Sequence, residues 1–378
     1  MDRPVIPVVF ATDENYVPYC GVAVSSLIQN ACRNNSYEIS VLYDHISDAS
    51  RWRLEQQSTD YAHVRCICIH DYITELKVQE YNHLTITSAY RLIIPEVLSQ
   101  YEKILYLDSD IVVDADIAEL YNTDIGDNIL GAVRGYFKKD DGEFMYKHIT
   151  QTLGIAVDHF FNAGILIMNR KALEENQVTE KCFSLLAKRT DLYFMDQCAM
   201  NIVCEGRVYF LPEKWNFEWQ YLFSAEEHAF KSMDHLGIIH YDGIEKPWDY
   251  PGQILAEKFW SYARKTIFYE EILQSAQIKS TRAVLEVFGG IGKFRNIAVY
   301  GAGNAGKRYV DKILSLKLCN IVSWVDKNYE NIHETKLRVE SVETLYKKEF
   351  DHVVIAIENK TVSVEVEKML VMKASCII

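Results

Sequence analysis

Two aspartates separated by one residue, Asp108 and Asp110, stand between two apolar runs. Residues 104–107 read Ile-Leu-Tyr-Leu and residues 111–113 read Ile-Val-Val, so acids interrupt what should be a buried strand. Side chains at i and i+2 of a strand point to the same side, and two ionised carboxylates held so close need a cation between them. A divalent metal supplies that cation. Without this setting, an Asp-x-Asp pattern is more often a solvated turn or a helix cap.

A histidine, His240, ends another apolar run, residues 237–240, and begins the sequence His-Tyr-Asp-Gly. Two carboxylates and one imidazole suit Mn²⁺ or Mg²⁺ better than a structural zinc site. We therefore expect Asp108, Asp110 and His240 to hold a divalent metal. Taken alone, a histidine at such a position is more often a core residue whose ring is hydrogen-bonded.

The segments around these residues alternate between strand-like and helix-like patterns. Runs that are apolar on both faces, alternating with amphipathic stretches, predict an α/β fold with a parallel or mixed sheet covered on both sides. Ligands of such sheets bind beyond the carboxyl ends of the strands, where Asp108 and His240 stand. Strands are expected at residues 5–11, 39–43, 64–69, 104–107, 111–113, 163–168 and 237–240, and helices at residues 19–30, 47–58, 88–101, 196–203 and 251–274.

The length and charge of the chain indicate two domains of different character. A chain of 378 residues is too long for one core of ordinary size. Its formal net charge is -13, which divides into -17 over residues 1–278 and +4 over residues 279–378. We place the domain boundary at residues 277/278. A surface this acidic excludes a general nucleic-acid binder, and an anionic ligand would need a local cation.

The nine cysteines are scattered without a Cys-x-x-Cys pair, and their odd number argues against a closed disulfide framework. They are interpreted as reduced thiols. The first ten residues resemble no signal sequence, and no apolar stretch approaches the length of a transmembrane helix. A soluble cytoplasmic protein is expected, with oligomers possible.

The last hundred residues contain a second α/β beginning, after a Gly-rich turn at residues 289–292. An expected strand at residues 296–300 precedes Gly-Ala-Gly-Asn-Ala-Gly, which satisfies the dinucleotide pattern GxGxxG. Further strands are expected at residues 321–325, near 339 and at 353–357. This size suits a small Rossmann-like domain, either nucleotide-binding or a structural or interaction module. The candidate nucleotide residues are Gly301, Gly303, Gly306 and Asp326.

Six motifs along the first domain resemble glycosyltransferase family 8, to which retaining bacterial lipopolysaccharide galactosyl- and glucosyltransferases and glycogenin belong. They stand in family order over roughly residues 5–275, so the resemblance covers nearly three quarters of the chain. The resemblance implies a nucleotide-diphospho-sugar transferase fold of the GT-A type, with a mixed sheet, for residues 1–277. The motifs are FATDENY (10–16), TSAYRL (87–92), ILYLDSDIVV (104–113), FNAGILIMN (161–169), DQ (196–197) and HYDGIEKPW (240–248).

The same resemblance implies that the motifs bind different parts of a UDP-sugar and that the metal bridges its two phosphates. The implied contacts are Ala11, Thr12, Asp13 and Asn15 for uracil, Ser109 for the ribose, Gly243 and Lys246 for the diphosphate, Arg91, Asn162, Ala163 and Asp196 for the donor sugar, and Gln197 beside its anomeric carbon.

The implied reaction is retaining transfer of a hexose from UDP-glucose or UDP-galactose to a saccharide or glycan acceptor, as in lipopolysaccharide biosynthesis. Gln197 is an amide and a poor nucleophile, which favours a front-face displacement; a double displacement through Asp196 is the alternative. The aromatic side chains of residues 215, 217, 219 and 221 are expected in the core, with stacking on the acceptor as the alternative. His83, Tyr90 and Trp248 are undecided between packing and the site.

One departure from the family leaves the sugar and the acceptor open. Where the family's galactosyltransferases carry an acid, residues 131–135 read Gly-Ala-Val-Arg-Gly. The chain also has an α/β module in place of the basic, aromatic tail of some relatives. Two other functions remain: a nucleotide-sugar sensor without catalysis, and an NAD-dependent oxidoreductase that uses the terminal glycine motif.

Overall fold

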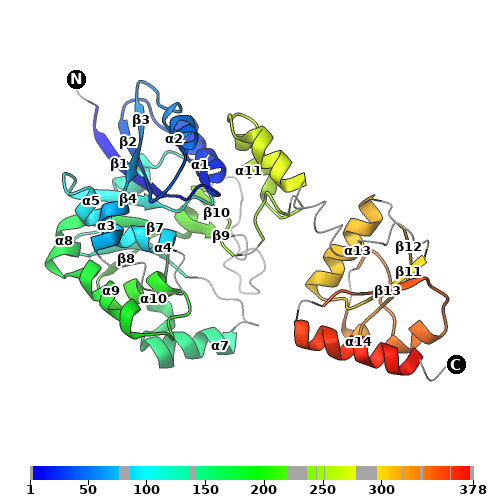
Figure 1. The fold of residues 1–378 in the computed structure, drawn as a ribbon. Coiled ribbons are helices and arrows are strands. Elements are labelled where there is room, and N and C mark those ends of the chain that lie inside the picture. Colours follow the sequence, from blue (N-terminus) through cyan, green and yellow to red (C-terminus); the bar gives the residue numbers. More distant parts are fainter. Residues whose placement is uncertain are drawn as a thin grey trace. The chain divides into compact units, whose positions relative to one another are not determined.

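The structure, a computed structural model, describes residues 3–75, 86–135, 142–218, 236–243, 245–250, 252–277, 296–316, 319–332, 335–357 and 359–374. The chain divides into two compact units, Met1–Ala276 and Gln277–Ile378 (Figure 1). Each unit is described by itself.

A seven-stranded mixed sheet forms the centre of the first unit, in the order β3-β2-β1-β4-β7-β6-β8. The first four strands of this order are parallel, and β7 runs antiparallel to both of its neighbours. Strands β6 and β8 were not predicted. The strands are β1 (Val5–Ala11), β2 (Ser36–Tyr43), β3 (Ala62–Cys68), β4 (Lys103–Leu107), β6 (Leu130–Arg134), β7 (Phe161–Asn169) and β8 (Val208–Phe210).

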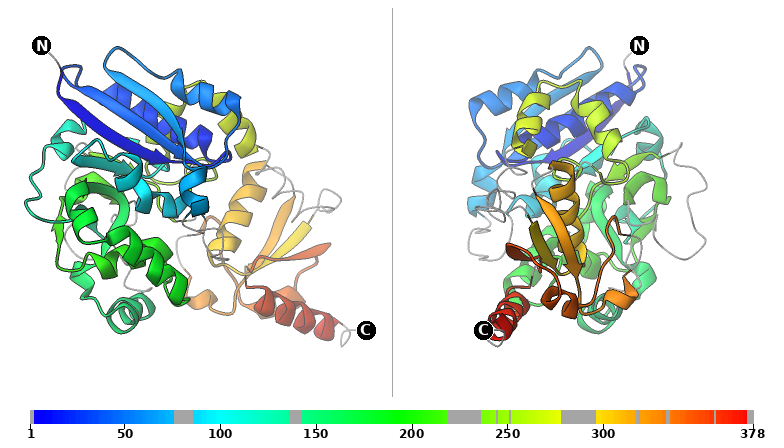
Figure 2. Two further views of the ribbon diagram at one scale, coloured as in Figure 1. Left: turned by 60° about the vertical axis from the view of Figure 1, so that its left-hand side comes forward. Right: turned by 90° about the vertical axis from the view of Figure 1, so that its right-hand side faces the viewer.

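Both faces of this sheet are buried, as the apolar runs predict. Along β1, Val8 and Phe10 contribute to one core and Val9 and Ala11 to the other, because successive side chains of a strand point to opposite faces. Helices cover both faces (Figure 2). The helices used below are α1 (Val17–Asn30), α2 (Asp48–Glu55), α9 (Val178–Lys188), α10 (Met195–Val203) and α11 (Ala256–Ala263).

Two helices that were predicted as continuous are each divided into shorter helices, so the prediction of their continuity was wrong. The helix expected at residues 88–101 is three short pieces, α4 (Ile86–Ala89), η2 (Tyr90–Ile93) and α5 (Ile94–Val97). Pro95, which lacks a backbone N–H, stands in the first turn of α5, where it starts a helix rather than continuing one.

The helix expected at residues 251–274 is also divided. It begins only at α11, because the preceding Leu255 has a left-handed backbone with φ 71°. It ends before Arg264, and a second helix spans residues 269–277. The hydroxyl of Thr266 between them accepts a hydrogen bond from the N–H of Phe268, as in a turn.

A small second sheet, in the order β5-β10-β9, positions the predicted histidine. It contains β5 (Ile111–Val113), β10 (Ile238–His240) and β9 (Phe217–Glu218). Strands β5 and β10 are antiparallel, and His240 pairs with Ile111, the residue after Asp110. This register brings two segments about 130 residues apart in sequence together at the site.

The second unit is built on a three-stranded parallel sheet in the order β12-β11-β13. Near residue 339 there is only an isolated bridge, between Val325 and Glu340, in place of the expected strand. Residues 289–292 lie outside the described residues. The elements are β11 (Asn296–Tyr300), α13 (Asn304–Leu316), β12 (Asn320–Val325), β13 (His352–Ile355) and α14 (Lys360–Ala374).

The eight cysteines within the described residues are free thiols, as predicted. In the same part of the chain, we find no helix with the length and apolar character needed to cross a lipid bilayer.

Candidate functional site

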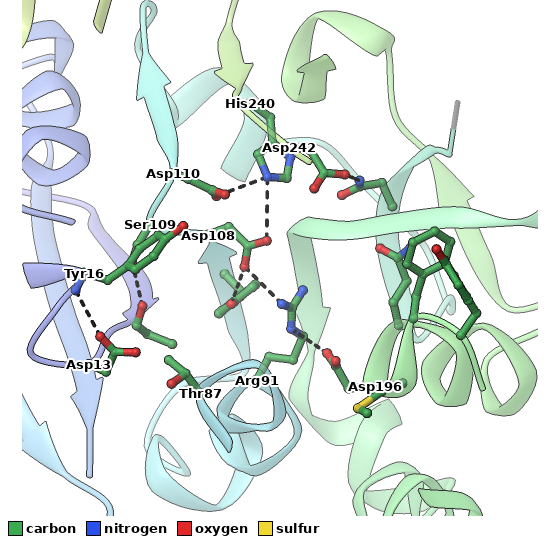
Figure 3. A pocket seen from close by; sticks show the side chains of 17 residues that line it. Asp13, Tyr16, Thr87, Arg91, Asp108, Ser109, Asp110, Asp196, His240 and Asp242 are labelled. Carbon is green, nitrogen blue, oxygen red and sulfur yellow. Dashed lines mark hydrogen bonds and ion pairs between the residues drawn. The ribbon is translucent and has the colours of Figure 1, made fainter. Parts of the chain in front are cut away.

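A cavity of about 580 Å³ opens at the carboxyl ends of β1 and β4 (Figure 3). Ten of the residues predicted for the site line it. Their side chains come from segments spread over much of the first unit, from residue 11 to residue 240. They are Ala11, Asp13, Arg91, Asp108, Ser109, Asp110, Asn162, Asp196, Gln197 and His240.

Five other predicted donor-binding residues lie outside the cavity lining. Thr12 is buried, and its hydroxyl donates to the Asp13 carbonyl at 3.1 Å. Asn15 is exposed. Ala163, Gly243 and Lys246 each contact lining residues rather than the cavity.

The lining also includes residues that the sequence analysis did not assign to the site. Four of them stand within the quoted motifs, so their positions were available as a signal. Tyr193, Phe194 and Met195 immediately precede the predicted Asp196, and no motif marked them. The additional lining residues are Tyr16, Thr87, Tyr106, Tyr193, Phe194, Met195 and Asp242.

The three predicted metal ligands form one cluster (Figure 3). The Nε2 atom of His240 lies 3.2 Å from Oδ1 of Asp110 and 3.8 Å from Oδ2 of Asp108. One ligand atom from each of the three residues lies within 4.8 Å of the others. Such a set of two carboxylates and one imidazole fits a divalent cation that prefers oxygen with some nitrogen.

The cluster has this shape because residue 164 of β7 is glycine. A Cβ atom there would lie 2.4 Å from Cε1 of His240 and 2.8 Å from Oδ2 of Asp108. The backbone of Gly164 also accepts a hydrogen bond from the Asp108 N–H at 2.8 Å. Any side chain at this position would therefore displace two of the three predicted ligands.

Two cationic side chains, Lys246 and His240, surround the Asp110 carboxylate. The Lys246 ammonium lies 2.5 Å from Oδ2 of Asp110 and also donates to the Tyr241 carbonyl at 2.7 Å. Burial alone would raise the pKa of Asp110, but Lys246 and His240 hold it well below its usual range. Burial would likewise lower the pKa of His240, but the Asp110 carboxylate raises it to about 9. The imidazole is therefore charged at neutral pH when only a proton occupies the cluster.

Arg91 connects the cluster with the opposite wall of the cavity. Its guanidinium lies 3.2 Å from Oδ1 of Asp108 and 2.9 Å from Oδ2 of Asp196, and it donates to the Ala163 carbonyl at 2.5 Å. It also lies 4.9 Å from the ring centre of Tyr106. Burial opposes its charge, but Asp108 raises its pKa above the ordinary value. A planar fork of five donors can hold several acceptors at once.

Asp196 and Gln197 lie in the first turn of α10, directly after its strained first residue, Met195. Met195 has φ 41°, a left-handed conformation that costs a non-glycine residue free energy. The Gln197 side chain accepts a hydrogen bond from the Ala163 N–H at 2.8 Å. Its amide therefore has a fixed orientation at the cavity wall.

A buried polar layer lies behind the ligands, and the sequence analysis did not identify it. Asn162 donates to Oε1 of Glu218 at 3.1 Å and to Oδ2 of Asp242 at 3.3 Å, and it accepts from Asn216 at 2.9 Å. Burial, and then the charge of Asp242, raise the pKa of Glu218 to about 8. Glu218 therefore carries a proton at neutral pH. Its strand β9 has only two residues, too few for a recognisable pattern.

The aromatic residues that were candidates for acceptor stacking belong to the core where they are described. Trp215 and Phe217 are 2% and 0% exposed, so the stacking alternative was wrong for both. Tyr90 and Trp248 are also buried, and Trp248 stacks on Tyr19 with ring centres 3.8 Å apart. His83, Trp219 and Tyr221 lie outside the described residues.

In the second unit, the contacts of the glycine motif are largely internal. A Cβ at Gly306 would lie 1.9 Å from the Gly301 carbonyl oxygen, and Gly301 itself has φ 103°. Both carboxylate oxygens of Asp326 accept backbone N–H groups, from Ala302 at 2.7 Å and Asn328 at 2.8 Å. Gly303, by contrast, faces open space. Nucleotide binding at this motif stays a prediction.

Comparison with known proteins identifies the first unit. Residues 7–252, well over half of the chain, match glycosyl transferase family 8. The chain belongs to this family. Its relatives include glycosyltransferase GlyE of Streptococcus pneumoniae, 28% identical over 68% of this chain and 60% of GlyE. A putative glycosyltransferase of Haemophilus influenzae is 27% identical over 56% of this chain and 62% of the relative. The matched segment thus spans about three fifths of each of these two proteins.

Other family members are related over more of their own length. A lipopolysaccharide 1,2-glucosyltransferase of Escherichia coli is 26% identical over 65% of this chain and 74% of the relative. Among solved structures, the galactosyltransferase LgtC in complex with donor and acceptor sugar analogues is 27% identical with a TM-score of 0.58, covering 69% of this chain and 96% of LgtC. The bifunctional glycosyltransferase WbbM is 25% identical with a TM-score of 0.63, covering 72% and 51%. The predicted mixed-sheet fold of the GT-A type is confirmed.

Proposed function

We propose that this protein transfers a hexose from UDP-glucose or UDP-galactose to a saccharide or glycan acceptor, with retention of configuration. Mn²⁺ or Mg²⁺ would be held by Asp108, Asp110 and His240. The observation that carries the proposal is the convergence of these three ligands within 4.8 Å at the wall of one cavity. Membership of glycosyl transferase family 8 supports it.

The residues present fit a divalent metal. Gly164 leaves the space that the cluster needs, and the His240 Nε2 atom faces both acids. When bound, the metal would act as a Lewis acid that stabilises the charge developing on the leaving diphosphate. Lys246, bonded to Asp110, would add an ammonium donor beside the phosphates.

At the nucleotide end of the cavity, Asp13 and Tyr16 belong to the loop that follows β1. The Asp13 side chain accepts a hydrogen bond from the Tyr16 N–H at 3.0 Å, which fixes the loop. Ser109 donates to the Ala11 carbonyl at 2.6 Å and joins this loop to the metal ligands. We assign uracil to the loop, with Thr12 and Asn15 contributing as the family resemblance implies, and the ribose to Ser109.

The cavity lining also includes Arg91, Asn162, Asp196 and Gln197. We assign the donor hexose to these residues, with the Ala163 backbone beside them and the Gly243 N–H toward the diphosphate. Asp196 is ion-paired with Arg91 at 2.9 Å. This ion pair stabilises the Asp196 carboxylate but engages the oxygen that would have to act as a nucleophile. Since Gln197 is a poor nucleophile, we favour a front-face displacement over a covalent intermediate on Asp196.

Glycan acceptors are proposed from the names of relatives, which include a lipopolysaccharide glucosyltransferase. A cytoplasmic location is proposed with them, because UDP-sugars are the donors. Cell fractionation tests the location, and the anomeric configuration of the product, read by NMR, tests retention. A sugar adduct trapped on Asp196 would replace the front-face mechanism by a double displacement.

A screen of UDP-sugars for UDP release in Mn²⁺ tests the proposal, with Asp110→Asn as the matched variant. We expect UDP release from one or a few hexose donors, with slower release when water is the acceptor than when a glycan is. A chelator or Asp110→Asn should abolish this release. UDP-sugar binding without release under any of these conditions would instead indicate a sensor. NAD(H) binding, followed by its fluorescence, tests the oxidoreductase alternative.

A further inference from the structure

Three exposed aromatic rings lie in a row that begins at the cavity, and we call them the aromatic platform. Phe144 on α7 (Gly142–Lys147) is 60% exposed, Tyr193 is 62% exposed and Phe194 is 37% exposed. The ring centres lie 5.4 Å apart for Phe144 and Tyr193 and 4.8 Å apart for Tyr193 and Phe194. Tyr193 and Phe194 also line the cavity. The platform therefore continues the cavity wall outward as far as Phe144.

A buried histidine supports the platform from below. His148 is 7% exposed, its ring is parallel to that of Phe144 within 8°, and its centre lies 6.1 Å from that of Tyr193. Its Nε2 atom lies 3.7 Å from the thiol of Cys198 on α10. Burial lowers the pKa of His148 below its ordinary value. The ring contacts of His148 with Phe144 and Tyr193 hold the outer part of the platform in place.

Exposed apolar side chains that lie in one contiguous patch often mark a binding site, whereas singly scattered ones are common on any protein surface. We propose that the aromatic platform binds sugar units of a saccharide acceptor that lie beyond the unit receiving the hexose. This inference rests on the proposed function for what the cavity transfers. The C–H face of a pyranose ring is apolar and packs on an aromatic face, while its hydroxyl groups remain in water.

The charges beside the platform favour a neutral saccharide over a lipid surface. Glu143 and Lys147 on α7 are paired at 2.5 Å, and Arg189 and Asp191 before α10 are paired at 2.8 Å. Each of these pairs is neutral as a whole. Residues 1–278 carry a net charge of -17, which anionic lipids would repel.

The position of the platform also predicts the length of the acceptor. Tyr193 and Phe194 line the cavity, whereas Phe144 does not line it and contacts the outer of these two rings, Tyr193, at 5.4 Å. A monosaccharide in the cavity would not reach Phe144, but a longer saccharide would. Removing the Phe144 ring should therefore affect oligosaccharides more than monosaccharides.

The test compares the full-length protein with Phe144→Ala, Phe144→Tyr and Trp52→Ala on an array of immobilised oligosaccharides that contain glucose, galactose and N-acetylhexosamines. Trp52 on α2 is 59% exposed and serves as the matched aromatic control. We expect Phe144→Ala to weaken binding of the best oligosaccharide about ten-fold, which is the low end of the loss caused by removing an aromatic ring that stacks on a nucleic-acid base. Phe144→Tyr should restore binding, and Trp52→Ala should bind like the wild type.

Equal binding by Phe144→Ala and the wild type would overturn the inference, as would a wild-type protein that binds none of the oligosaccharides. So would binding of phosphatidylglycerol vesicles that depends on Phe144, because the platform would then be a lipid surface. UDP release is measured on the same preparations. If oligosaccharides bind through Phe144 but no UDP-sugar is turned over, the platform stands and the proposed function fails.

Discussion

The Nδ1 atom of His240 lies 2.8 Å from the Oδ1 atom of Asn216. The amide of Asn216 has a defined orientation, because its Nδ2 donates to Asn162 Oδ1 at 2.9 Å. An amide oxygen only accepts, so Nδ1 of His240 carries a hydrogen and Nε2 is the atom that faces Asp108 and Asp110. Asn216 therefore orients the imidazole so that Nε2 faces the cluster.

Substitution of Asn216 should weaken metal binding without touching a ligand. We expect Asn216→Ala to lower the affinity for Mn²⁺ by about 10- to 100-fold, as loss of such supporting hydrogen bonds does in other metal sites. Asn216→Asp keeps an acceptor for the imidazole N–H and should lose less. Calorimetric titration with Mn²⁺ in the presence of UDP measures both. Equal affinities for wild type and Asn216→Ala would show that Asn216 has only a packing role.

Gly164 offers a test of the space around the ligands. A methyl group there would overlap His240 and Asp108, so we expect Gly164→Ala to abolish detectable Mn²⁺ binding and to cost about 1 to 3 kcal/mol of stability. At Gly252 a Cβ atom would have no neighbouring atom within 4 Å, and Gly252→Ala is the control within the same unit. Normal Mn²⁺ binding by Gly164→Ala would contradict the account of the cluster.

Glu218 makes stability depend on pH. Its pKa is raised to about 8 in the folded protein from an ordinary 4.5. The contribution of the protonated carboxyl to the free energy of unfolding is therefore fully present below about pH 4.5. It is lost as pH rises towards 8, by at most about 1.4 kcal/mol per pH unit.

Glu218→Gln removes this titration but keeps an acceptor for Asn162. We expect similar unfolding temperatures for the wild type and the variant at pH 5, and a more stable variant at pH 8, both measured by calorimetry with a chelator present. Glu213→Gln, at an exposed position, is the control. A difference between Glu218→Gln and wild type that stays constant from pH 5 to 8 would refute the buried, protonated state.

The sequence predicted the candidate ligand cluster of Asp108, Asp110 and His240 because each residue follows or ends an apolar strand, β4 or β10. It also predicted most of the large sheet. It missed β6, β8 and β9, which are short or lack a distinct pattern, and with them Asn216 and Glu218 behind the ligands. These residues became part of the site through pairing between β9 and β10, a contact between segments that local sequence does not specify.

The aromatic residues show the same limit. The aromatic pattern at residues 215–221 is compatible with packing in the core or with stacking on a sugar. Trp215 and Phe217 are buried, so these two side chains belong to the core. Phe144 and Tyr193 lie almost fifty residues apart in sequence, and only the tertiary fold brings their rings into contact. A sequence pattern therefore could not reveal the platform.

Two variants of the glycine motif in the second unit distinguish a packing role from a role in nucleotide binding. We expect Gly306→Ala to destabilise this unit by about 1 to 3 kcal/mol, because its methyl group would meet the Gly301 carbonyl. Gly303→Ala should leave the unfolding temperature unchanged, since Gly303 faces open space. Thermal unfolding of the full chain measures both. Loss of binding of a nucleotide such as NAD⁺ by Gly303→Ala, with stability unchanged, would support a nucleotide site at this motif.

Calorimetric titration of the protein with UDP, in Mn²⁺ and in a chelator, measures whether Asp108, Asp110 and His240 hold a metal on which nucleotide binding depends. We expect UDP to bind at least about ten-fold more weakly in the chelator, a loss of about 1.4 kcal/mol, and Asp110→Asn to bind UDP with the same weak affinity under both conditions. Equal UDP affinity of the wild-type protein with and without Mn²⁺ would show that these three residues hold no such metal.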